Sequence, residues 1–153
     1  MTGLILLIAA LAVAAVVGAA VRVRSGKIQS FSRTDSAGSP GTSAAVNVLT
    51  AGDLGASLGE RATLVQFSTE FCAFCGPTRK LLNELAGEEP GVAFVEVDAA
   101  DRMDLTRRFK VFSTPTVLVL RPDGSVAARS AGQQSKPALA ESLWSVLNDG
   151  VRP

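Results

Sequence analysis

Residues 63–75 have the sequence TLVQFSTEFCAFC, in which a short apolar run leads into a pair of cysteines. The run 63–67 is typical of a buried strand, and the leucines beyond residue 80 recur at helical spacing. Cys72 and Cys75 are the only cysteines in the chain, and they lie at this strand-to-helix junction. A thiol in the first turn of a helix meets unpaired N–H groups and the positive end of the helix dipole, which favour the thiolate. We therefore expect the pair to be reactive.

The composition of the 153-residue chain excludes several functions. It has no histidine, which removes Ser/His/Asp and Cys/His catalysis and histidine metal ligands. A formal net charge of +1, without a basic patch that carries aromatics, argues against nucleic-acid binding. Two cysteines supply only half of a zinc site, so we expect no metal. Redox chemistry is the best use of the pair, and the alternative is an inert pair in a binding module.

The N-terminal residues 2–21 form an uncharged apolar run of about the length that spans a bilayer. We predict a transmembrane anchor, although the small residues at 17–19 also permit cleavage of a signal peptide. Basic residues follow the run, at Arg22, Arg24 and Lys27. The positive-inside rule therefore places the remainder of the chain in the cytoplasm, as part of a single-pass cell-membrane protein.

Residues 22–45 are predicted to be a flexible linker, since they are rich in small and polar residues. Residues 46–149 then form a single folded domain. Apolar runs suggest strands at 46–49, 63–67, 92–97, 116–120 and 125–129, with 63–67 and 92–97 central in the sheet. Helices are expected from Thr50 to Leu58, from the cysteine motif to about Pro90, over 102–110 and over 135–148.

This order predicts an α/β domain with a mixed central sheet and helices on both faces. In helix 102–110, the residues expected to face the core are Met103, either Leu105 or Thr106, and Phe109. The sequence at 122–124, Pro-Asp-Gly, predicts a turn between the last two strands. Strands that end beside helix starts place Cys72 at the carboxyl edge of the sheet, where functional groups of such folds gather.

Three ordered motifs resemble the thioredoxin family. The first is the strand, cysteine motif and helix of residues 64–86, the second is Ser113-Thr114-Pro115-Thr116 ahead of a strand, and the third is Gly132 ahead of the last helix. The resemblance extends over residues 46–149 and implies a thioredoxin-like fold.

The resemblance also implies roles for individual residues. Cys72 would be the nucleophile that attacks a substrate disulfide, and Cys75 would resolve the mixed disulfide. Phe71, Thr114 and Pro115 would contact substrate, with Pro115 following a cis peptide bond. No bound cofactor is implied beyond the redox-active Cys72–Cys75 disulfide. The implied partners are protein disulfides or dithiols, and an electron donor such as a thioredoxin reductase or another dithiol protein.

The chain departs from the family pattern around the cysteines. Phe71 stands where the family most often has Trp, and Ala73-Phe74 replaces the common Gly-Pro. Gln66 stands where many members have a buried Asp, and Phe94 where a Lys often neighbours that Asp. Because glutamine cannot titrate, deprotonation of Cys75 would rely on water or on another group such as Glu70.

The sequence therefore predicts a membrane-tethered thiol–disulfide oxidoreductase that acts on protein disulfides, most simply as a reductase. Two alternatives remain. One is a redox-inert thioredoxin-like binding module. The other is an extracytoplasmic oxidoreductase that keeps apocytochrome or other envelope thiols reduced, which requires the opposite membrane orientation.

Overall fold

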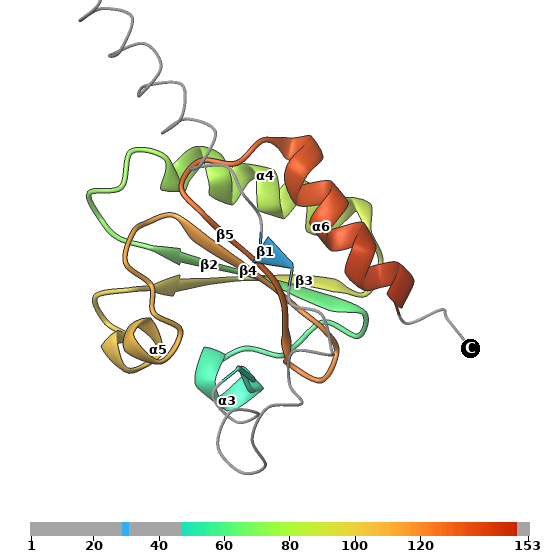
Figure 1. The fold of residues 1–153 in the computed structure, drawn as a ribbon, viewed down its shortest axis with the longest axis horizontal. Coiled ribbons are helices and arrows are strands. Elements are labelled where there is room, and N and C mark those ends of the chain that lie inside the picture. The colour runs from blue at the N-terminus through green and yellow to red at the C-terminus, as the bar shows by residue number, and fades with distance from the viewer. Residues whose placement is uncertain (1–28, 31–46, 150–153) are drawn as a thin grey trace, which may run out of the picture.

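The computed structural model describes residues 29–30 and 47–149 of the chain (Figure 1). The predicted anchor, 2–21, lies outside the described residues, as does most of the predicted linker, 22–45. Among the residues that are described, no helix combines the length and the apolar character needed to cross a membrane. The transmembrane helix therefore stays a prediction.

A five-stranded sheet forms the centre of the domain, in the order β1-β5-β4-β2-β3. β2 runs parallel to β3 and antiparallel to β4, and β4 is antiparallel to β5, so the predicted mixed sheet is confirmed. The strands are β1, Gln29–Ser30; β2, Ala62–Ser68; β3, Val92–Asp98; β4, Thr116–Leu120; and β5, Val126–Ala131.

β2 and β3 differ in their surroundings although both sequences predicted central strands. Every residue of β2 is buried, because β2 has a strand on each side and helices over both faces. β3 pairs only with β2 among the described strands and is partly exposed, so the prediction of a central position for 92–97 was wrong. An apolar segment rich in valine, such as 92–97, is compatible both with a central strand and with an edge strand that helices cover.

The first predicted strand, 46–49, is also wrong. Val48 makes a single antiparallel bridge with Ser125, and pairing stops there because Thr50 caps the helix that begins at Ala51. The remaining strand of the sheet is instead β1, which lies within the predicted linker and pairs antiparallel with β5, Gln29 opposite Arg129. The range 22–45 thus includes one short strand.

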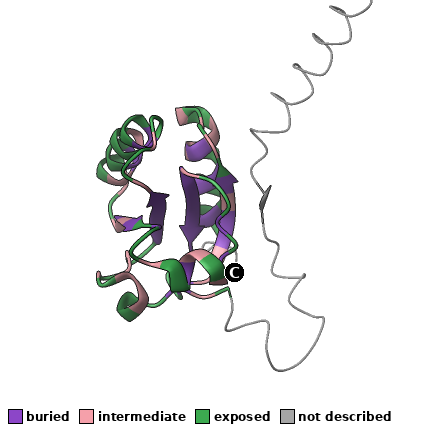
Figure 2. Cartoon of the chain, turned by 90° about the vertical axis from the view of Figure 1, so that its left-hand side faces the viewer, coloured by how far each residue is buried: buried purple, intermediate pink, exposed green. Residues whose placement is uncertain are grey.

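Within the described residues, four helices pack against the sheet: α3, Ala51–Leu54; α4, Cys75–Glu88; α5, Met103–Arg108; and α6, Lys136–Asp149. α4 and α6 cover one face of the sheet, and α3 and α5 lie on the other (Figure 1). The buried residues concentrate between these layers, while the outer helix faces are exposed (Figure 2). This is the predicted arrangement of helices on both faces.

Side chains of β2 alternate between two apolar clusters. Leu64 joins the cluster of α4 and α6, whereas Val65 and Phe67 join the cluster of α3 and α5. The period of two of a strand produces this division. Gln66, between Val65 and Phe67, therefore points toward α4, and this orientation brings a buried polar side chain to the cysteines.

The helix ends follow local chemistry. Thr50 caps α3 through a capping box with Asp53, as its position suggested, but α3 ends at Leu54 rather than Leu58, because Gly55 is left-handed with φ 64°. In α5, Leu105 and Phe109 are buried as predicted. Met103 is 45% exposed, so its predicted core position was wrong. It is the first residue of α5, whose one buried residue is Leu105.

Candidate active site

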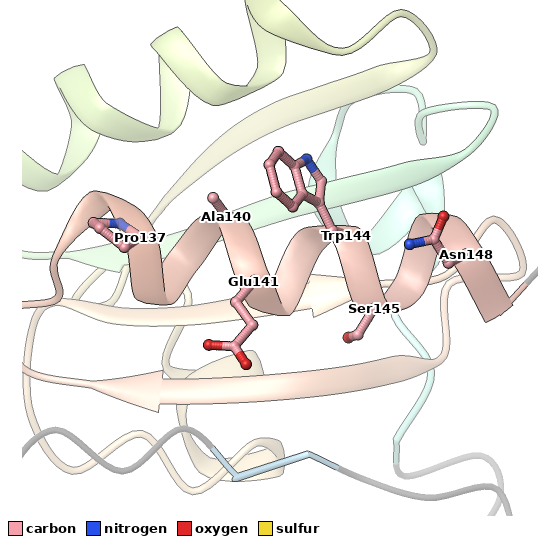
Figure 3. Close-up of a pocket in the computed structure, with 6 residues that line it drawn as sticks. All are labelled: Pro137, Ala140, Glu141, Trp144, Ser145 and Asn148. Carbon is pink, nitrogen blue, oxygen red and sulfur yellow. The ribbon is translucent and has the colours of Figure 1, made fainter.

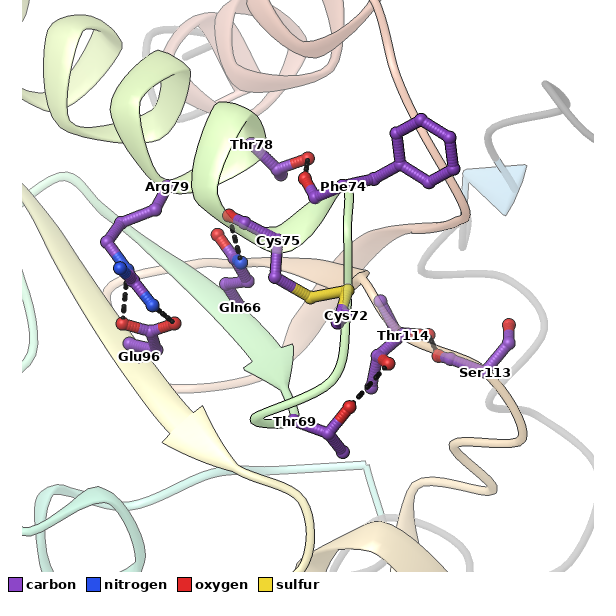
Figure 4. Close-up of a disulfide and its surroundings, with 11 residues drawn as sticks. Gln66, Thr69, Cys72, Phe74, Cys75, Thr78, Arg79, Glu96, Ser113 and Thr114 are labelled. Carbon is purple, nitrogen blue, oxygen red and sulfur yellow. Dashed lines mark hydrogen bonds and ion pairs between the residues drawn. A yellow bond between two sulfur atoms is a disulfide. The ribbon is translucent and has the colours of Figure 1, made fainter.

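Cys72 and Cys75 form a disulfide at the carboxyl end of β2, with 5.4 Å between their Cα atoms (Figure 4). The sequence predicted this edge of the sheet for the pair. It also predicted a helix start at the motif, and the details differ there. α4 begins at Cys75, so Cys72 lies in the preceding turn rather than in the first helical turn.

Backbone hydrogen bonds shape the turn that carries the disulfide. The Cys72 amide donates to the Thr69 carbonyl, and the Cys75 amide donates to the Cys72 carbonyl, both at 3.2 Å. Pro77 lies in the first turn of α4, where its missing N–H removes no helical hydrogen bond. The chain direction therefore reverses between β2 and α4, with both sulfur atoms at the reversal.

The two cysteines differ in exposure. Cys72 is half-buried, whereas Cys75, the first residue of α4, is 3% exposed. An external sulfur atom can therefore reach Cys72 more readily than Cys75. This difference matches the order of attack that the family resemblance implies, although the roles themselves stay predictions.

The second motif, Ser113-Thr114-Pro115, lies against the disulfide turn. The Thr114–Pro115 peptide bond is cis, as predicted. The Thr114 and Thr69 hydroxyl groups are hydrogen-bonded at 3.1 Å, which joins the two loops (Figure 4). The Gly132 amide donates to the Pro115 carbonyl at 2.8 Å, so all three sequence motifs meet at one edge of the sheet.

Gln66 is completely buried beside Cys75. Its Nε2 donates a hydrogen bond to the Cys75 carbonyl at 2.9 Å (Figure 4). Its Oε1 is buried and has no hydrogen-bond partner among the described residues. A buried acceptor without a donor is costly, by about 1–3 kcal/mol. The buried polar group next to Cys75 is therefore an amide that holds the backbone and cannot take up a proton.

A carboxylate and a guanidinium lie close to Gln66, on β3 and α4. Arg79 donates to both carboxylate oxygens of Glu96, at 2.6 and 2.7 Å (Figure 4). Glu96 is the register partner of Gln66 in the sheet. Hydrogen bonding from Arg79 is the main reason that the pKa of Glu96 is lowered. Glu96 therefore stays ionised near neutral pH and is a weak proton acceptor.

Three exposed phenylalanines lie on segments that adjoin the disulfide. Phe71 precedes Cys72 and is 93% exposed, and Phe74 lies between the cysteines and is half exposed. Phe112 precedes the Ser113-Thr114-Pro115 loop and is 90% exposed. Phe71 had been predicted to contact substrate. Phe112 had not been singled out, although its place directly before the loop motif is visible in the sequence.

A hollow away from the disulfide runs along the outer face of α6, where Trp144 is 56% exposed (Figure 3). The described residues that line it all come from α6: Pro137, Ala140, Glu141, Trp144, Ser145 and Asn148. None of these side chains is a nucleophile held near a base. Within the described part of the chain, no cluster of three His, Cys, Asp or Glu residues is arranged to hold a metal ion.

The fold and the disulfide at the sheet edge define a thiol–disulfide oxidoreductase. The Thioredoxin family model matches residues 46–145. A thioredoxin of Staphylococcus haemolyticus is 35% identical over 81 residues, which are 52% of this chain and 77% of that protein. A thioredoxin of Chlamydia trachomatis is 31% identical over 94 residues, 61% of this chain and 91% of that protein. The chain belongs to the thioredoxin family.

Other matches agree with this membership. A protein described as putative thioredoxin H10, from Arabidopsis thaliana, is 31% identical over 85 residues, 53% of this chain, and the match spans about half of that protein, 55%. Among solved structures, a mutant thioredoxin from Halobacterium salinarum superposes with a TM-score of 0.53 at 22% identity, over 57% of this chain and 76% of that one. This likeness shows the fold.

Proposed function

We propose that this protein reduces disulfide bonds of protein substrates close to a membrane, with Cys72 as nucleophile and Cys75 as resolving thiol. The observation that carries the proposal is the unequal exposure of the two sulfur-bearing residues, half-buried Cys72 and almost fully buried Cys75, at a reactive sheet edge. Only one of the two is placed to meet a large partner.

The proposed reaction has two exchange steps. The reduced Cys72 thiolate attacks one sulfur of a substrate disulfide, so a Cys72–substrate disulfide forms and the first substrate thiolate leaves and takes up a proton. Cys75, after losing its proton, attacks Cys72 Sγ and releases the second substrate thiol. Two electrons have then passed to the substrate, and the product on the protein is the Cys72–Cys75 disulfide of this structure.

The proposed reaction needs an acceptor for the proton of Cys75, because Gln66 stands where many family members have a buried Asp. Gln66 cannot act as a base, and Arg79 holds Glu96 in its ionised form. Glu70, the other group considered from the sequence, is exposed on the disulfide turn. We infer that the proton of Cys75 passes to water or to the leaving substrate thiolate.

The membrane part of the proposal rests on the apolar run 2–21 and on the basic residues that follow it. The position of β1 supports a short tether. Residues 22–28 separate the proposed anchor from β1, and they reach at most about 25 Å at full extension. The folded domain, 46–149, would thus work close to the cytoplasmic surface, supplied with electrons by a thioredoxin reductase or another dithiol protein.

Reduction of insulin disulfides by the full chain in mild detergent tests the activity. With dithiothreitol as reductant, we expect insulin to precipitate faster than in the reductant alone. Cys75→Ser should accumulate a mixed disulfide through Cys72, visible as a larger species on a non-reducing gel. Absence of both effects would favour the alternative of a redox-inert binding module.

The proposed orientation is tested separately with an impermeant thiol reagent on cells that express the chain. Cells are first treated with a permeant reductant, which is then removed. Labelling of Cys72 is expected only after lysis. Labelling in intact cells would place the domain outside and favour the extracytoplasmic oxidoreductase that keeps envelope thiols reduced.

A further inference from the structure

Phe112 lies in the loop between α5 and β4 with its side chain 90% exposed. Residues on both sides of Phe112 are buried. Val111, directly before it, is buried, and Pro115, three residues later, is buried against the sheet edge. The loop therefore directs one large apolar side chain outward while the residues around it are anchored.

Hydrogen bonds hold the backbone before Phe112. The guanidinium of Arg129, on β5, donates to the carbonyls of Phe109 and Lys110 at 2.5 and 2.7 Å. The Val111 amide donates to the Thr106 carbonyl at 2.8 Å. The segment that leaves α5 is thus tied both to the sheet and to its own helix.

The backbone after Phe112 is held as well. The Thr116 hydroxyl donates to the Ser113 carbonyl at 2.7 Å, and the Thr114 hydroxyl is hydrogen-bonded to Thr69. Because the loop is ordered on both sides, contact with the Phe112 ring requires little additional ordering of the protein. An aromatic side chain on a preorganised backbone can anchor a partner at a reduced entropic cost.

A single exposed phenylalanine needs no explanation, but this one lies beside a second. Phe71 is 93% exposed, and the Thr69–Thr114 hydrogen bond joins the loops that carry the two rings. Each phenylalanine is two residues from that bond in the sequence. Two exposed rings therefore lie on hydrogen-bonded loops that adjoin the disulfide.

We propose that Phe112, together with Phe71, forms an apolar contact site that selects protein disulfides flanked by a large apolar side chain. The inference rests on the proposed function and names its substrate class. The occupant is a protein segment because the contact site adjoins a disulfide that exchanges with another disulfide. Glu70 and Lys110, exposed near the two rings in the sequence, carry opposite charges and favour neither sign of substrate.

The site acts in the first exchange step. Contact between the substrate side chain and the rings positions the substrate disulfide against Cys72, so it raises the second-order rate constant for mixed-disulfide formation. The resolving step is intramolecular and gains nothing from the contact. Selectivity should therefore appear when the reduced protein is oxidised by substrate under single-turnover conditions.

The test uses the pre-reduced full chain in detergent and two disulfide-linked peptides that differ only in the residue after cysteine, phenylalanine in one and serine in the other. Wild type should react about tenfold faster with the phenylalanine peptide, the order expected for partial burial of one ring. Phe112→Ser should reduce this ratio to about 2 or less, and Phe112→Leu should retain most of it. Phe71→Ser should also lower the ratio.

Trp144→Ser is the matched control, because Trp144 is an exposed aromatic on the outer face of α6. It should leave the ratio unchanged. Hydroxyethyl disulfide, which has no apolar flank, tests the proposed function alone. If wild type reduces it yet shows equal rates with both peptides, or if both serine variants at positions 71 and 112 keep the tenfold ratio, the contact site is overturned while the function stands. If no disulfide reacts, both are overturned.

Discussion

Two regions of the domain differ in where their polar and apolar groups lie. One is the edge of the sheet that carries the Cys72–Cys75 disulfide, and the other is the junction between α3 and α5. At the disulfide edge, Phe71 and Phe112 face solvent while the Gln66 Oε1 is buried without a donor among the described residues. At the junction, Asp53 accepts from the Thr50 amide at 2.9 Å and from the Arg108 guanidinium at 3.3 Å.

Further hydrogen bonds complete the junction. Arg102 donates to the Asp53 carbonyl, and Arg108 donates to the Val48 carbonyl. Leu105 is buried beneath this polar layer. At the junction these polar groups are hydrogen-bonded and the apolar side chain is buried, as a stable fold requires. The disulfide edge departs from this pattern in its exposed phenylalanines and in its buried acceptor without a donor. Such departures are expected where a protein meets its substrate. Substitutions at the edge should therefore change the reaction, and substitutions at the junction should change folding.

Cys72→Ser should have the largest effect. Serine cannot form the disulfide, so the rate of insulin reduction should fall at least about a thousandfold, to the rate of the reductant alone. The thermal midpoint should stay close to that of the reduced wild type, because neither protein then contains the Cys72–Cys75 bond and a serine side chain is close in size to cysteine. Turnover assays and thermal unfolding of the reduced wild type and the variant measure the two quantities. Residual turnover near the wild-type rate would remove Cys72 from the proposed mechanism.

Leu105→Ala tests the junction between α3 and α5. Leu105 is 1% exposed in the cluster beneath α5, and its truncation should lower the free energy of unfolding by about 2–5 kcal/mol. Urea unfolding measures the loss. At temperatures where the variant is folded, its insulin-reduction rate should equal that of wild type. A rate that falls together with the stability would mean that the two regions are coupled.

The features predicted correctly from the sequence depend on residues close together in the chain. Thr50 and Asp53 are three residues apart and form the predicted cap, and residues 122–124 form the predicted turn, with φ 79° at Gly124. The strand of residues 63–67 was recognised because an uninterrupted apolar run leads into the cysteine motif. The cis Thr114–Pro115 bond followed from family resemblance, since periodicity does not distinguish the two isomers.

The features that could not be predicted depend on which segments pair in space. β1 has the sequence Gln29-Ser30, which carries no strand signal, and it forms because the edge of β5 offers hydrogen bonds. The position of β3 at the edge of the sheet likewise depends on which strands pair in space, since β3 pairs only with β2 among the described strands. The exposure of Phe112 also escaped prediction, because an apolar residue beside a strand is expected to be buried. Exposed apolar residues at a reactive edge are visible only once the loops have been placed.

Asp53→Asn should have a smaller effect, and one that depends on pH. Hydrogen bonding to the Thr50 amide is the largest cause of the lowered pKa of Asp53, and Arg108 contributes. A carboxyl with a lowered pKa in the folded state stabilises the protein above its unfolded pKa, near 3.8. The difference in unfolding free energy between wild type and variant should therefore be about 1 kcal/mol at pH 7. It should disappear as the pH falls through the folded pKa.

Urea unfolding of both proteins from pH 7 down to about pH 2.5 measures this dependence. Thr50→Ala removes the hydroxyl that accepts from the Asp53 amide and should cost about 1 kcal/mol at pH 7. A difference between wild type and Asp53→Asn that grows on acidification would reverse the sign and contradict the assigned cause.

Gln66→Leu should have the smallest effect on stability, because two contributions oppose each other. The substitution removes the hydrogen bond from Nε2 to the Cys75 carbonyl, which contributes about 1 kcal/mol. It also removes the buried Oε1 that has no donor among the described residues, which relieves about 1–3 kcal/mol. Leucine fills a similar volume in a position that is completely buried. The free energy of unfolding should therefore stay within about 1 kcal/mol of wild type, or rise.

Gln66→Leu should change the rate of the reaction more than it changes the free energy of unfolding. This difference separates a positioning role of Gln66 from a stabilising one. Without the hydrogen bond, the first turn of α4 is held less firmly, so release of substrate by Cys75 should slow while formation of the mixed disulfide does not. Rapid quenching with acid, followed by separation of the mixed disulfide, distinguishes these steps. A loss of stability above about 2 kcal/mol would instead mean that Oε1 has a donor, such as an ordered water, and that the disulfide edge is as well satisfied as the junction.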